Sequence, residues 1–463
     1  MTEDFKVNKI CCIGAGYVGG PTMAVIASNC PDIQVTVVDI DEKRISAWND
    51  NDLKNLPVFE PGLDEIVKRC RGINLHFSID IDNAIANSDM IFLSVNTPTK
   101  ETGIGAGQAS DLKWIEISAR RVAKNAQGKT IVVEKSTLPV KTAETIKKIL
   151  DSSKNDQFYN KKEFFVLSNP EFLAEGTAIN DLQNPDRVLI GGDSQSAINA
   201  LEKIYLNWIN KGKVIKTNLW SSELSKLTAN AFLAQRISSI NSISALCEST
   251  GADIKEVSKA IGMDSRIGSH FLNSGPGFGG SCFKKDILNL VYLCNHYGLD
   301  EVGNYWEKVL DINSWQQKRI SKVITEKLFG NLFNKKISIL GFAFKANTND
   351  TRESPAIKIC KDLLEEGAKL SIYDPKVEHN QIIKDLINVG AVTTKVDCEV
   401  NLEQSIINSD AVVILTEWEE FKKLDWAKIS KIMRKPSWIF DTRNMVKNNL
   451  ESFGLNYWGL GKK

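Results

Sequence analysis

The feature that most constrains the fold is a glycine pattern near the N-terminus, G14-A-G-Y-V-G19. A short apolar run precedes it, a helix-compatible segment follows it, and a second apolar run ends in Asp39, twenty residues after Gly19. Glycines at these positions let the backbone approach a pyrophosphate, whose charge the following helix N-terminus attracts. The pattern therefore predicts a Rossmann-like dinucleotide-binding domain.

The acid at the end of the second run favours NAD as the cofactor. Asp39 can accept hydrogen bonds from the ribose hydroxyls, and its charge would repel the 2′-phosphate of NADP. Arg44 argues mildly in the other direction, because an arginine near the ribose can accommodate that phosphate. Ordinary turn glycines are the alternative for Gly14, Gly16 and Gly19, but the surrounding strand, helix and acid favour a nucleotide site.

Later apolar runs in the first half end in polar residues, as buried parallel strands do. These runs end at or near Asn96, Thr137 and Glu171, with Thr97 and Glu175 close behind. Ligands bind at the carboxyl ends of parallel strands, so we expect these side chains at the ligand-binding edge of the sheet. Strand-end capping is the alternative for each of them taken singly.

A long uninterrupted helix is predicted from Trp220 to about Gly251, where the glycine acts as a C-cap. Its expected packed stripe consists of Leu224, Leu227, Ala231 and Ala234. Lys226 and Asn230 are four residues apart and therefore share a face of the helix. They either face solvent or project into a site, and the helical pattern leaves both possibilities open.

After Gly330 the alternation of strand and helix restarts, with a second strand that ends in Asp374. This segment is a degenerate repeat of the N-terminal pattern without its glycine fingerprint. Lys345, Arg352 and Arg443 fall at strand ends or in loops, where their charges suit a second phosphate-bearing ligand. Ordinary surface cations are the alternative.

The predicted fold is an α/β protein with two Rossmann-like, doubly wound parallel-sheet domains joined by a long central helix. We expect an NAD-binding domain over 1–215, a central helical domain over 216–328 and a nucleotide-like domain over 329–463.

Composition excludes several classes of protein. A net charge of +1 gives no reason to expect nucleic acid as a partner, and no apolar run is long enough to span a membrane. Four widely separated histidines show no metal-ligand spacing, so we expect no metal. Nine cysteines without a C-x-x-C pair, behind an N-terminus that lacks a signal sequence, predict reduced thiols in a cytoplasmic enzyme.

Cys282 differs from the other cysteines in its neighbours: glycines precede it and two lysines and an acid follow it, in the segment G277-F-G-G-S-C-F-K-K-D286. The residues before Cys282 are typical of a helix start with Ser281 as N-cap, which would place the thiol in the first turn. The helix dipole there, with Lys284 and Lys285, would favour the thiolate. An inert loop or core cysteine is the alternative.

A thiolate extends what an NAD-dependent dehydrogenase can do. An aldehyde must become tetrahedral before it can lose a second hydride, and a thiolate achieves this by adding to the carbonyl to form a thiohemiacetal. Oxidation of that adduct gives a thioester, from which water releases an acid. Cys282 therefore predicts oxidation as far as the acid level.

Four motifs spread along the chain resemble those of the UDP-glucose 6-dehydrogenases of the UDP-glucose/GDP-mannose dehydrogenase family, and of the animal-type enzymes above all. They are G-F-G-G-S-C-F-K-K-D, S-E-L-S-K-L-T-A-N-A-F, N-P-E-F-L-A-E-G and G-F-A-F-K…D-T-R-E-S. The resemblance runs from Ile10 to Lys463. It implies that UDP-glucose is oxidised at C6 to UDP-glucuronate with two NAD reduced per sugar. It also implies that the central domain over 216–328 is a dimerisation domain that carries the catalytic cysteine, and that the C-terminal domain binds the UDP-sugar.

The resemblance also implies roles for individual positions. Its catalytic set is Cys282 as nucleophile, Lys226 as oxyanion stabiliser, Asp286 as base through a water, Asn230 as hydrogen-bond donor, and Thr137 and Glu171 near the water, with Glu171 serving hydrolysis. Its cofactor set is Gly14, Gly16, Tyr17, Val18, Gly19, Asp39, Arg44, Val95, Asn96, Thr97, Thr137, Glu175, Lys285 and Arg352. Its substrate set is Glu171, Phe172, Leu173, Ala174, Glu175, Lys226, Asn230, Arg266, Phe271, Leu272, Asn273, Gly277, Phe278, Gly279, Cys282, Phe283, Phe344, Lys345 and Arg443. Arg266 matches a residue that reaches the sugar of a neighbouring subunit, which implies homo-oligomers, either dimers or the hexamer of the family.

The chain departs from the family in the substrate loop. Asn273 stands where a lysine is usual, and Gly275-Pro276 differs from the animal-type loop. A lost cation would weaken the binding of the diphosphate and makes the sugar preference an open question. GDP-mannose and UDP-N-acetylmannosamine are the alternative substrates, because the site residues would serve equally for the shared chemistry at C6. Two further functions stay open at this point: a non-catalytic NAD- and nucleotide-sugar-binding regulator, and a dehydrogenase that stops at the aldehyde.

Overall fold

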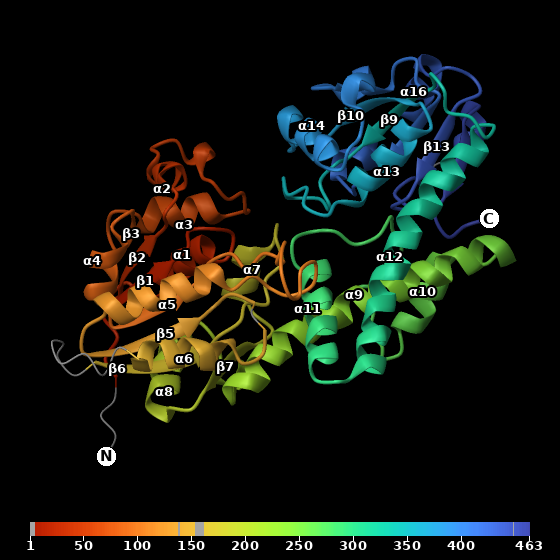
Figure 1. Ribbon diagram of the computed structural model, residues 1–463. Coiled ribbons are helices and arrows are strands. Elements are labelled where there is room, and N and C mark those ends of the chain that lie inside the picture. Colours follow the sequence, from red (N-terminus) through yellow and green to blue (C-terminus); the bar gives the residue numbers. More distant parts are fainter. Residues whose placement is uncertain (1–4, 138, 153–161, 448) are drawn as a thin grey trace. The chain divides into compact units, whose positions relative to one another are not determined.

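The computed structural model describes residues 5–137, 139–152, 162–447 and 449–463, and the chain divides into two compact units, Met1–Ala229 and Asn230–Lys463 (Figure 1). Each unit is built around its own β-sheet with helices on its faces. The predicted α/β class with two doubly wound sheets is confirmed.

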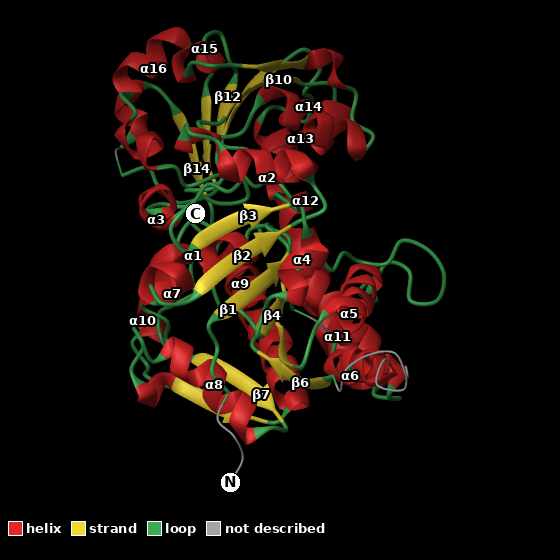
Figure 2. Cartoon of the chain, turned by 90° about the vertical axis from the view of Figure 1, so that its left-hand side faces the viewer, coloured by secondary structure: helices red, strands yellow, loops and turns green. Residues whose placement is uncertain are grey.

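The sheet of the first unit is parallel except at one junction. Its strands, from edge to edge, are β3 (Leu75–Ser78), β2 (Gln34–Val38), β1 (Lys9–Ile13), β4 (Met90–Leu93), β5 (Lys129–Glu134), β6 (Glu163–Ser168), β7 (Val188–Gly192) and β8 (Val214–Thr217). Figure 2 shows β1, β2 and β3 side by side. The junction that breaks the pattern is β6 with β7, which pair antiparallel. The predicted edge of strand ends therefore extends from β3 to β6.

Both faces of this sheet are buried, as the strand sequence requires. Along β1, Ile10 and Cys12 pack into the hydrophobic cluster on one face, and Cys11 and Ile13 pack into the cluster on the other. The covering helices are α1 (Gly19–Asn29), α2 (Glu42–Asn49), α3 (Leu63–Cys70), α4 (Ile81–Ala86), α5 (Lys113–Asn125), α6 (Thr142–Ser152), α7 (Ala178–Gln183) and α8 (Gln195–Tyr205). This burial holds the strand ends rigidly in place.

The long central helix, α9, spans Leu219–Thr250, close to its predicted bounds. Gly251 ends it with a φ of +86° and donates its N–H to the carbonyl of Cys247. Leu227, Ala231 and Ala234 are fully buried as expected. The prediction for Leu224 was wrong: the residue is 43% exposed, although helical periodicity places it on the same face of α9 as the packed stripe.

The second unit contains three further helices before its sheet: α10 (Ile254–Gly262), α11 (Phe283–His296) and α12 (Asp300–Lys327). Its sheet is parallel throughout, in the order β11 (Val396–Cys398), β10 (Lys369–Tyr373), β9 (Lys336–Leu340), β12 (Ala411–Ile414), β13 (Trp438–Asp441) and β14 (Asn456–Gly459). The helices of this sheet are α13 (Pro355–Glu365), α14 (His379–Asn388), α15 (Leu402–Ile406) and α16 (Trp426–Ile432).

The two sheets repeat one turn in detail. The N–H of Gly14 donates to Val38 at 2.8 Å, and the N–H of Gly341 donates to Tyr373 at the same distance. Both glycines have a positive φ, +112° and +93°. A Cβ on either would meet the segment that follows the adjacent strand at 2.2 and 2.4 Å, so both turns require glycine. The degenerate repeat predicted from the sequence is confirmed.

Candidate active site

The glycine turn after β1 is shaped to admit a ligand on one side only. A Cβ on Gly19 would lie 2.0 Å from the carbonyl oxygen of Gly14, so the helix must pack directly on the turn. A Cβ on Gly16, by contrast, would meet nothing within 4 Å. Open space beside Gly16, at a turn followed by the start of α1 after Val18, fits the pyrophosphate of a dinucleotide.

The acid after β2 is tied to the same turn. The Asp39 carboxylate accepts the Ala15 N–H at 2.8 Å and lies 3.1 Å from the guanidinium of Arg44. The Trp48 indole donates to the carbonyl of Ala15 at 2.9 Å, behind the turn. The predicted pair Asp39 and Arg44 therefore meets at the edge where a ribose would bind, and Trp48 is a support that the sequence pattern did not indicate.

The loops after β4 and β5 lie against each other. The Thr97 hydroxyl donates to the carbonyl of Thr137 at 3.2 Å, and the Ser136 hydroxyl donates to the carbonyl of Val95 at 2.7 Å. Thr97 is buried and Asn96 is exposed. These contacts bring the predicted residues Val95, Thr97 and Thr137 together at the carboxyl edge of the sheet.

A buried ion pair connects the loop after β6 with α9. Lys226 Nζ lies 3.1 Å from Glu171 Oε1, with side-chain exposures of 5% and 6%. The other carboxylate oxygen of Glu171 accepts the Leu173 N–H at 2.9 Å. The Phe172 ring lies between two cations, 3.8 Å from the Arg187 guanidinium and 5.5 Å from Lys226 Nζ. The helical face of Lys226 is thus directed into protein, which answers the question that the pattern left open.

The loop that carries Glu171 and Glu175 is held by an acid far away in the sequence. Glu60 is buried, and its carboxylate accepts the N–H groups of Gly176 at 2.7 Å and Ala178 at 3.0 Å. Sequence reasoning missed Glu60, because nothing local relates it to residues more than a hundred positions later. The loop therefore has a defined shape without helix or strand.

In the second unit, Asn230 of α9 meets Asp286 of α11. Asn230 Nδ2 donates to Asp286 Oδ2 at 2.6 Å, and both side chains are buried. Asp286 lies one turn after Cys282, to whose carbonyl it donates its N–H at 2.9 Å. The structure thus places three of the predicted catalytic residues around the start of α11.

The start of α11 differs from the prediction. Cys282 itself is the N-cap, with φ −101° and ψ −54°, and no side chain caps the helix. Ser281 as N-cap was wrong: its hydroxyl lies 3.4 Å from Cys282 Sγ instead of bonding to the backbone. The thiol is half-buried, whereas seven of the other cysteines are buried. Because Cys282 is the N-cap, its thiol lies at the positive end of the helix dipole, which favours a thiolate.

The two lysines after the cysteine have different partners. Lys285 Nζ lies 3.8 Å from Asp286 Oδ1 and is 18% exposed. Lys284 is 49% exposed and forms an ion pair with Glu353 at 2.9 Å. Its charge is therefore balanced by Glu353, and Lys285 is the lysine that adds positive charge next to Asp286.

The glycine-rich loop before Cys282 is clamped by two helices. Asn241 of α9 accepts the Gly275 N–H at 2.9 Å, and Gln316 of α12 donates to the Gly275 carbonyl at 2.9 Å. Asn313 of α12 accepts the N–H of Phe278 at 2.8 Å and donates to its carbonyl at 3.1 Å. The loop is therefore preformed rather than flexible.

The same loop lies close to the segment after β9. A Cβ on Gly279 would lie 2.5 Å from the Glu353 carbonyl oxygen, and one on Gly280 would lie 3.0 Å from the Phe344 ring. The N–H of Gly280 donates to the Arg352 carbonyl at 2.8 Å. Glycine is required here because two backbones approach each other directly.

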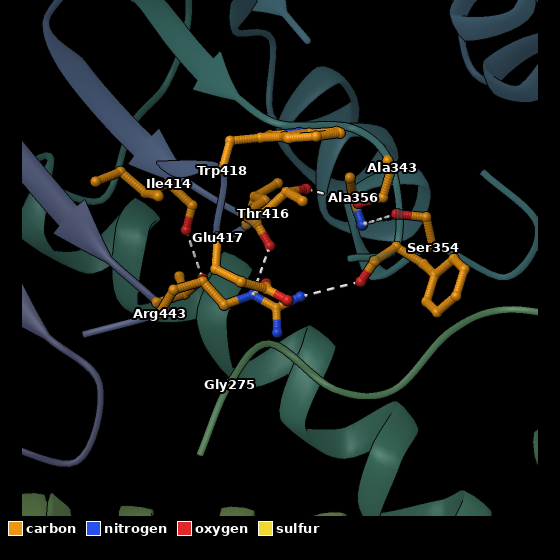
Figure 3. Close-up of polar contacts among 12 residues, drawn as sticks. Gly275, Ala343, Ser354, Ala356, Ile414, Thr416, Glu417, Trp418 and Arg443 are labelled. Carbon is orange, nitrogen blue, oxygen red and sulfur yellow. Dashed lines mark hydrogen bonds and ion pairs between the residues drawn. The ribbon is translucent and has the colours of Figure 1, made fainter. Parts of the chain in front are cut away.

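Arg443, after β13, completes this side of the second unit (Figure 3). Its Nε donates to the Leu415 carbonyl at 2.8 Å and lies 3.1 Å from Glu417 Oε2, and its Nη2 donates to the Phe344 carbonyl at 3.2 Å. A Cβ on Gly275 would lie 3.2 Å from Arg443 Nη1. Phe344, Arg443 and the glycine-rich loop, all predicted substrate contacts, are thus neighbours.

The other predicted residues differ in exposure and in their partners. Arg266 is 87% exposed on its side chain and pairs with Asp264 at 2.6 Å. Phe271 has a φ of +60°, and Asn273 is exposed. Arg352 is held by Asp350 at 2.6 Å, and Lys345 Nζ lies 5.4 Å from the Phe344 ring. Tyr17 is half-buried beside the first glycine turn.

Three family models match consecutive parts of the chain, and all describe one family. They are the NAD binding domain over residues 8–209, the central domain over 220–315 and the UDP binding domain over 338–448. The chain belongs to the UDP-glucose/GDP-mannose dehydrogenase family. The NAD binding domain of the family covers the glycine turn, Asp39 and the loop of Glu171, so NAD is the cofactor of this site.

Relatives within this dehydrogenase family match nearly the whole chain. UDP-glucose 6-dehydrogenase of Bos taurus is 55% identical over 99% of this chain and 94% of its own length. UDP-glucose 6-dehydrogenase 4 of Arabidopsis thaliana is 54% identical over 98% and 97%. The structure of a UDP-glucose dehydrogenase from Pyrobaculum islandicum matches with a TM-score of 0.85 at 28% identity, covering 99% of this chain and 98% of that one.

Two features are absent from the described residues. No helix there combines the length and apolarity needed to cross a membrane. Nor do three or more histidine, cysteine or acidic side chains gather there in a way that could hold a metal ion.

Proposed function

We propose that this chain oxidises UDP-glucose at C6 to UDP-glucuronate with two NAD reduced per sugar, using Cys282 as the nucleophile. The observation that carries the proposal is the arrangement along α9. Lys226, paired with Glu171, and Asn230, bonded to Asp286 next to Cys282, are one helical turn apart on one face. Buried charged and polar groups with specific partners cluster at functional sites.

The first oxidation turns the C6 alcohol into an aldehyde. NAD supplies a two-electron acceptor when bound at the glycine turn. The chain's own residues hold the reacting oxygen: Lys226 supplies positive charge to it, Asn230 donates a hydrogen bond, and Asp286 takes the hydroxyl proton through a water.

The second oxidation requires the thiol. The Cys282 thiolate forms a C–S bond to the aldehyde carbon, and the carbonyl oxygen becomes an oxyanion that Lys226 stabilises. Loss of the C6 hydrogen together with its bonding electron pair, for which the second NAD is the acceptor, converts this oxyanion into a thioester. The position of Cys282 at the N-terminus of α11 favours the thiolate form at the start of this sequence.

Hydrolysis ends the reaction. Water forms a C–O bond to the thioester carbon, the C–S bond breaks, and the thiolate of Cys282 is regenerated. Glu171 accepts the proton of the attacking water, a role that suits a carboxylate held by Lys226 and the Leu173 N–H. Thr137 contributes from the neighbouring loop, which Thr97 supports.

The substrate is proposed to bind against the preformed loop of the second unit. Phe344, Lys345 and Arg443, together with residues 271–279, supply aromatic surface and positive charge for a nucleoside diphosphate. The UDP binding domain of the family covers residues 338–448, in agreement with this assignment.

NADH stoichiometry tests the proposal. The wild type is expected to form two NADH per UDP-glucose, and Cys282→Ala is expected to form no UDP-glucuronate. One NADH per sugar with indifference to Cys282→Ser would support a dehydrogenase that stops at the aldehyde. A flat absorbance trace with tight ligand binding would support the non-catalytic regulator.

A second candidate substrate follows from Asn273, where the family usually has lysine. The solved UDP-D-ManNAc dehydrogenase of Pyrococcus horikoshii matches this chain with a TM-score of 0.81 at 26% identity, over 98% of this chain and 99% of that one. UDP-N-acetylmannosamine and GDP-mannose should therefore be assayed beside UDP-glucose. A higher kcat/KM for either would replace UDP-glucose as the substrate.

The proposal includes homo-oligomers, three domains and a cytoplasmic location. Exposed apolar side chains on α9, among them Phe232 and Leu246 at 54% and 58%, suit a contact between copies, and Arg266 would reach a neighbouring active site. Analytical ultracentrifugation tests the assembly.

The proposed domain limits are 1–215, 216–328 and 329–463. All nine cysteines are unpaired thiols, which suits the reducing cytoplasm.

A further inference from the structure

A second lysine, Lys135, is buried near the Lys226–Glu171 pair, and the mechanism above does not use it. It directly follows β5, and its side chain is almost fully enclosed. A buried ammonium must be compensated by hydrogen bonds or charge, so its retention needs a reason.

Lys135 is held in a small polar network. Its Nζ donates to Asn169 Oδ1 at 3.1 Å and to the Tyr205 hydroxyl at 3.3 Å. The Tyr205 hydroxyl donates to the same Asn169 oxygen at 2.6 Å, and Asn169 Nδ2 donates to the Leu189 carbonyl at 2.8 Å. Every polar atom of the Asn169 side chain is therefore engaged, and its rotamer is fixed.

Asn169 connects this network to the proposed hydrolytic base. It is two residues before Glu171, at the point where β6 has ended and the loop begins. Its backbone N–H donates to the Glu134 carbonyl at 2.9 Å, next to Lys135. The start of the loop that carries Glu171 is therefore anchored on the segment that carries Lys135, through one backbone and one side-chain bond.

The ionisable groups around Lys135 come from four elements. Glu171 faces it from the loop after β6, Lys226 from α9, Cys12 from β1 and Tyr205 from α8. Burial raises the pKa of both Cys12 and Tyr205, so these two groups are neutral. One carboxylate thus shares this buried region with two ammonium groups, of which Lys226 is its direct partner at 3.1 Å. Burial foremost, opposed by Glu171 and reinforced by Lys226, lowers the pKa of Lys135 to about 8.

We propose that Lys135 is a positioning residue for thioester hydrolysis: through Asn169 it fixes the loop of Glu171, and its ammonium balances the Glu171 carboxylate while Lys226 serves the C6 oxygen. This inference rests on the proposed function. It explains why a carboxylate needs two cations: when Lys226 turns to the oxyanion, Glu171 keeps a positive neighbour and stays available to the water.

Single-turnover kinetics with enzyme in excess over UDP-glucose test the proposal. Acid-quenched samples, read by intact-protein mass spectrometry, report the thioester on Cys282, and absorbance reports NADH. In Lys135→Met, both NADH equivalents are expected within threefold of the wild-type rate. Release of UDP-glucuronate is expected to slow at least tenfold, so the thioester accumulates.

The pH dependence of the release step is the readout that a merely structural role would not move. In the wild type, release should decline as pH rises through about 8, where Lys135 loses its proton. Lys135→Arg keeps the charge at all accessible pH values, so that decline should disappear while release stays within tenfold of the wild type. Lys148→Met, at a 75% exposed lysine of α6, is the matched control and should leave every rate unchanged.

Each outcome decides one question. A wild type that does not form two NADH overturns the proposed function. A normal wild type with unchanged release in Lys135→Met, or with oxidation and release slowed equally, overturns the role of Lys135. If Lys135→Met does not fold, Tyr205→Phe provides a second test, because it removes one hydrogen-bond acceptor from the Lys135 ammonium. The decline of the release rate in Tyr205→Phe should then have its midpoint at a lower pH than in the wild type. An unmoved midpoint contradicts the proposal.

Discussion

Removal of the Lys226 ammonium should destabilise the first unit measurably, because it strands a buried carboxylate. Lys226 Nζ and Glu171 Oε1 are 3.1 Å apart with both side chains nearly enclosed. At an effective dielectric constant of about 20, two charges at that distance attract by about 5 kcal/mol. Loss of one partner from a buried pair typically costs about 3–5 kcal/mol. The Leu173 N–H at 2.9 Å and the nearby Lys135 still support Glu171, so we expect about 3 kcal/mol for Lys226→Met.

Differential scanning calorimetry can measure this loss. For a unit of this size, about 3 kcal/mol corresponds to a decrease in Tm of roughly 6–12 °C. The double variant Lys226→Met/Glu171→Gln removes both charges and should recover most of the loss, since no carboxylate is left unbalanced. Lys148→Met, from the exposed pair with Glu144 at 2.7 Å, is the control and should not change the Tm.

The reasoning would be refuted by a loss below about 1 kcal/mol in the single variant, which is the range of exposed pairs. It would equally fail if the double variant were no more stable than Lys226→Met. Either result would mean that water or a rearranged neighbour solvates Glu171, and that the pair is not closed to solvent.

Three further changes test other parts of the structure. Gly16→Ala should fold normally, since its Cβ meets nothing within 4 Å, yet lower NAD affinity at least tenfold by calorimetric titration because the methyl group occupies the pyrophosphate space. Trp48→Leu should lower the free energy of unfolding by about 3 kcal/mol in urea, because a fully buried ring is lost. Glu134→Gln should remove a pH dependence. Burial, with the charge of Glu223, raises the pKa of Glu134 well above 4.5, so wild-type stability falls as pH rises above that value. The variant should match the wild type near pH 4.5 and have the higher Tm at pH 8.

Local patterns predicted the features that depend on neighbours in sequence. The strand, glycines and Asp39 of the first turn lie within about thirty residues, so their spacing indicates their contact. Lys226 and Asn230 follow from helical periodicity alone. The apolar stripe was misplaced at Leu224, because periodicity specifies a face but not how wide the packed part of it is.

Contacts between distant strands were beyond those patterns. The network of Lys135, Asn169 and Tyr205 depends on β5 lying next to β6 and on α8 packing against β6. The order of strands in a sheet cannot be inferred from any single segment of the sequence. The antiparallel junction of β6 with β7 was missed for the same reason. Ser281 and Cys282 differ as N-cap by one residue, which is within the usual uncertainty of a helix boundary.

The continuity of α9 has a consequence for how such a chain can change. Four residues of α-helix advance by about 6 Å and turn by about 40° past a full circle, so the spacing of Lys226 and Asn230 is a property of the helical repeat itself. A single inserted residue between them would turn Asn230 by about 100° relative to Lys226, so the two side chains would no longer share a face of the helix. Loops elsewhere can lengthen or shorten, but an insertion or deletion between these two residues of α9 would destroy the alignment of Lys226 with Asn230.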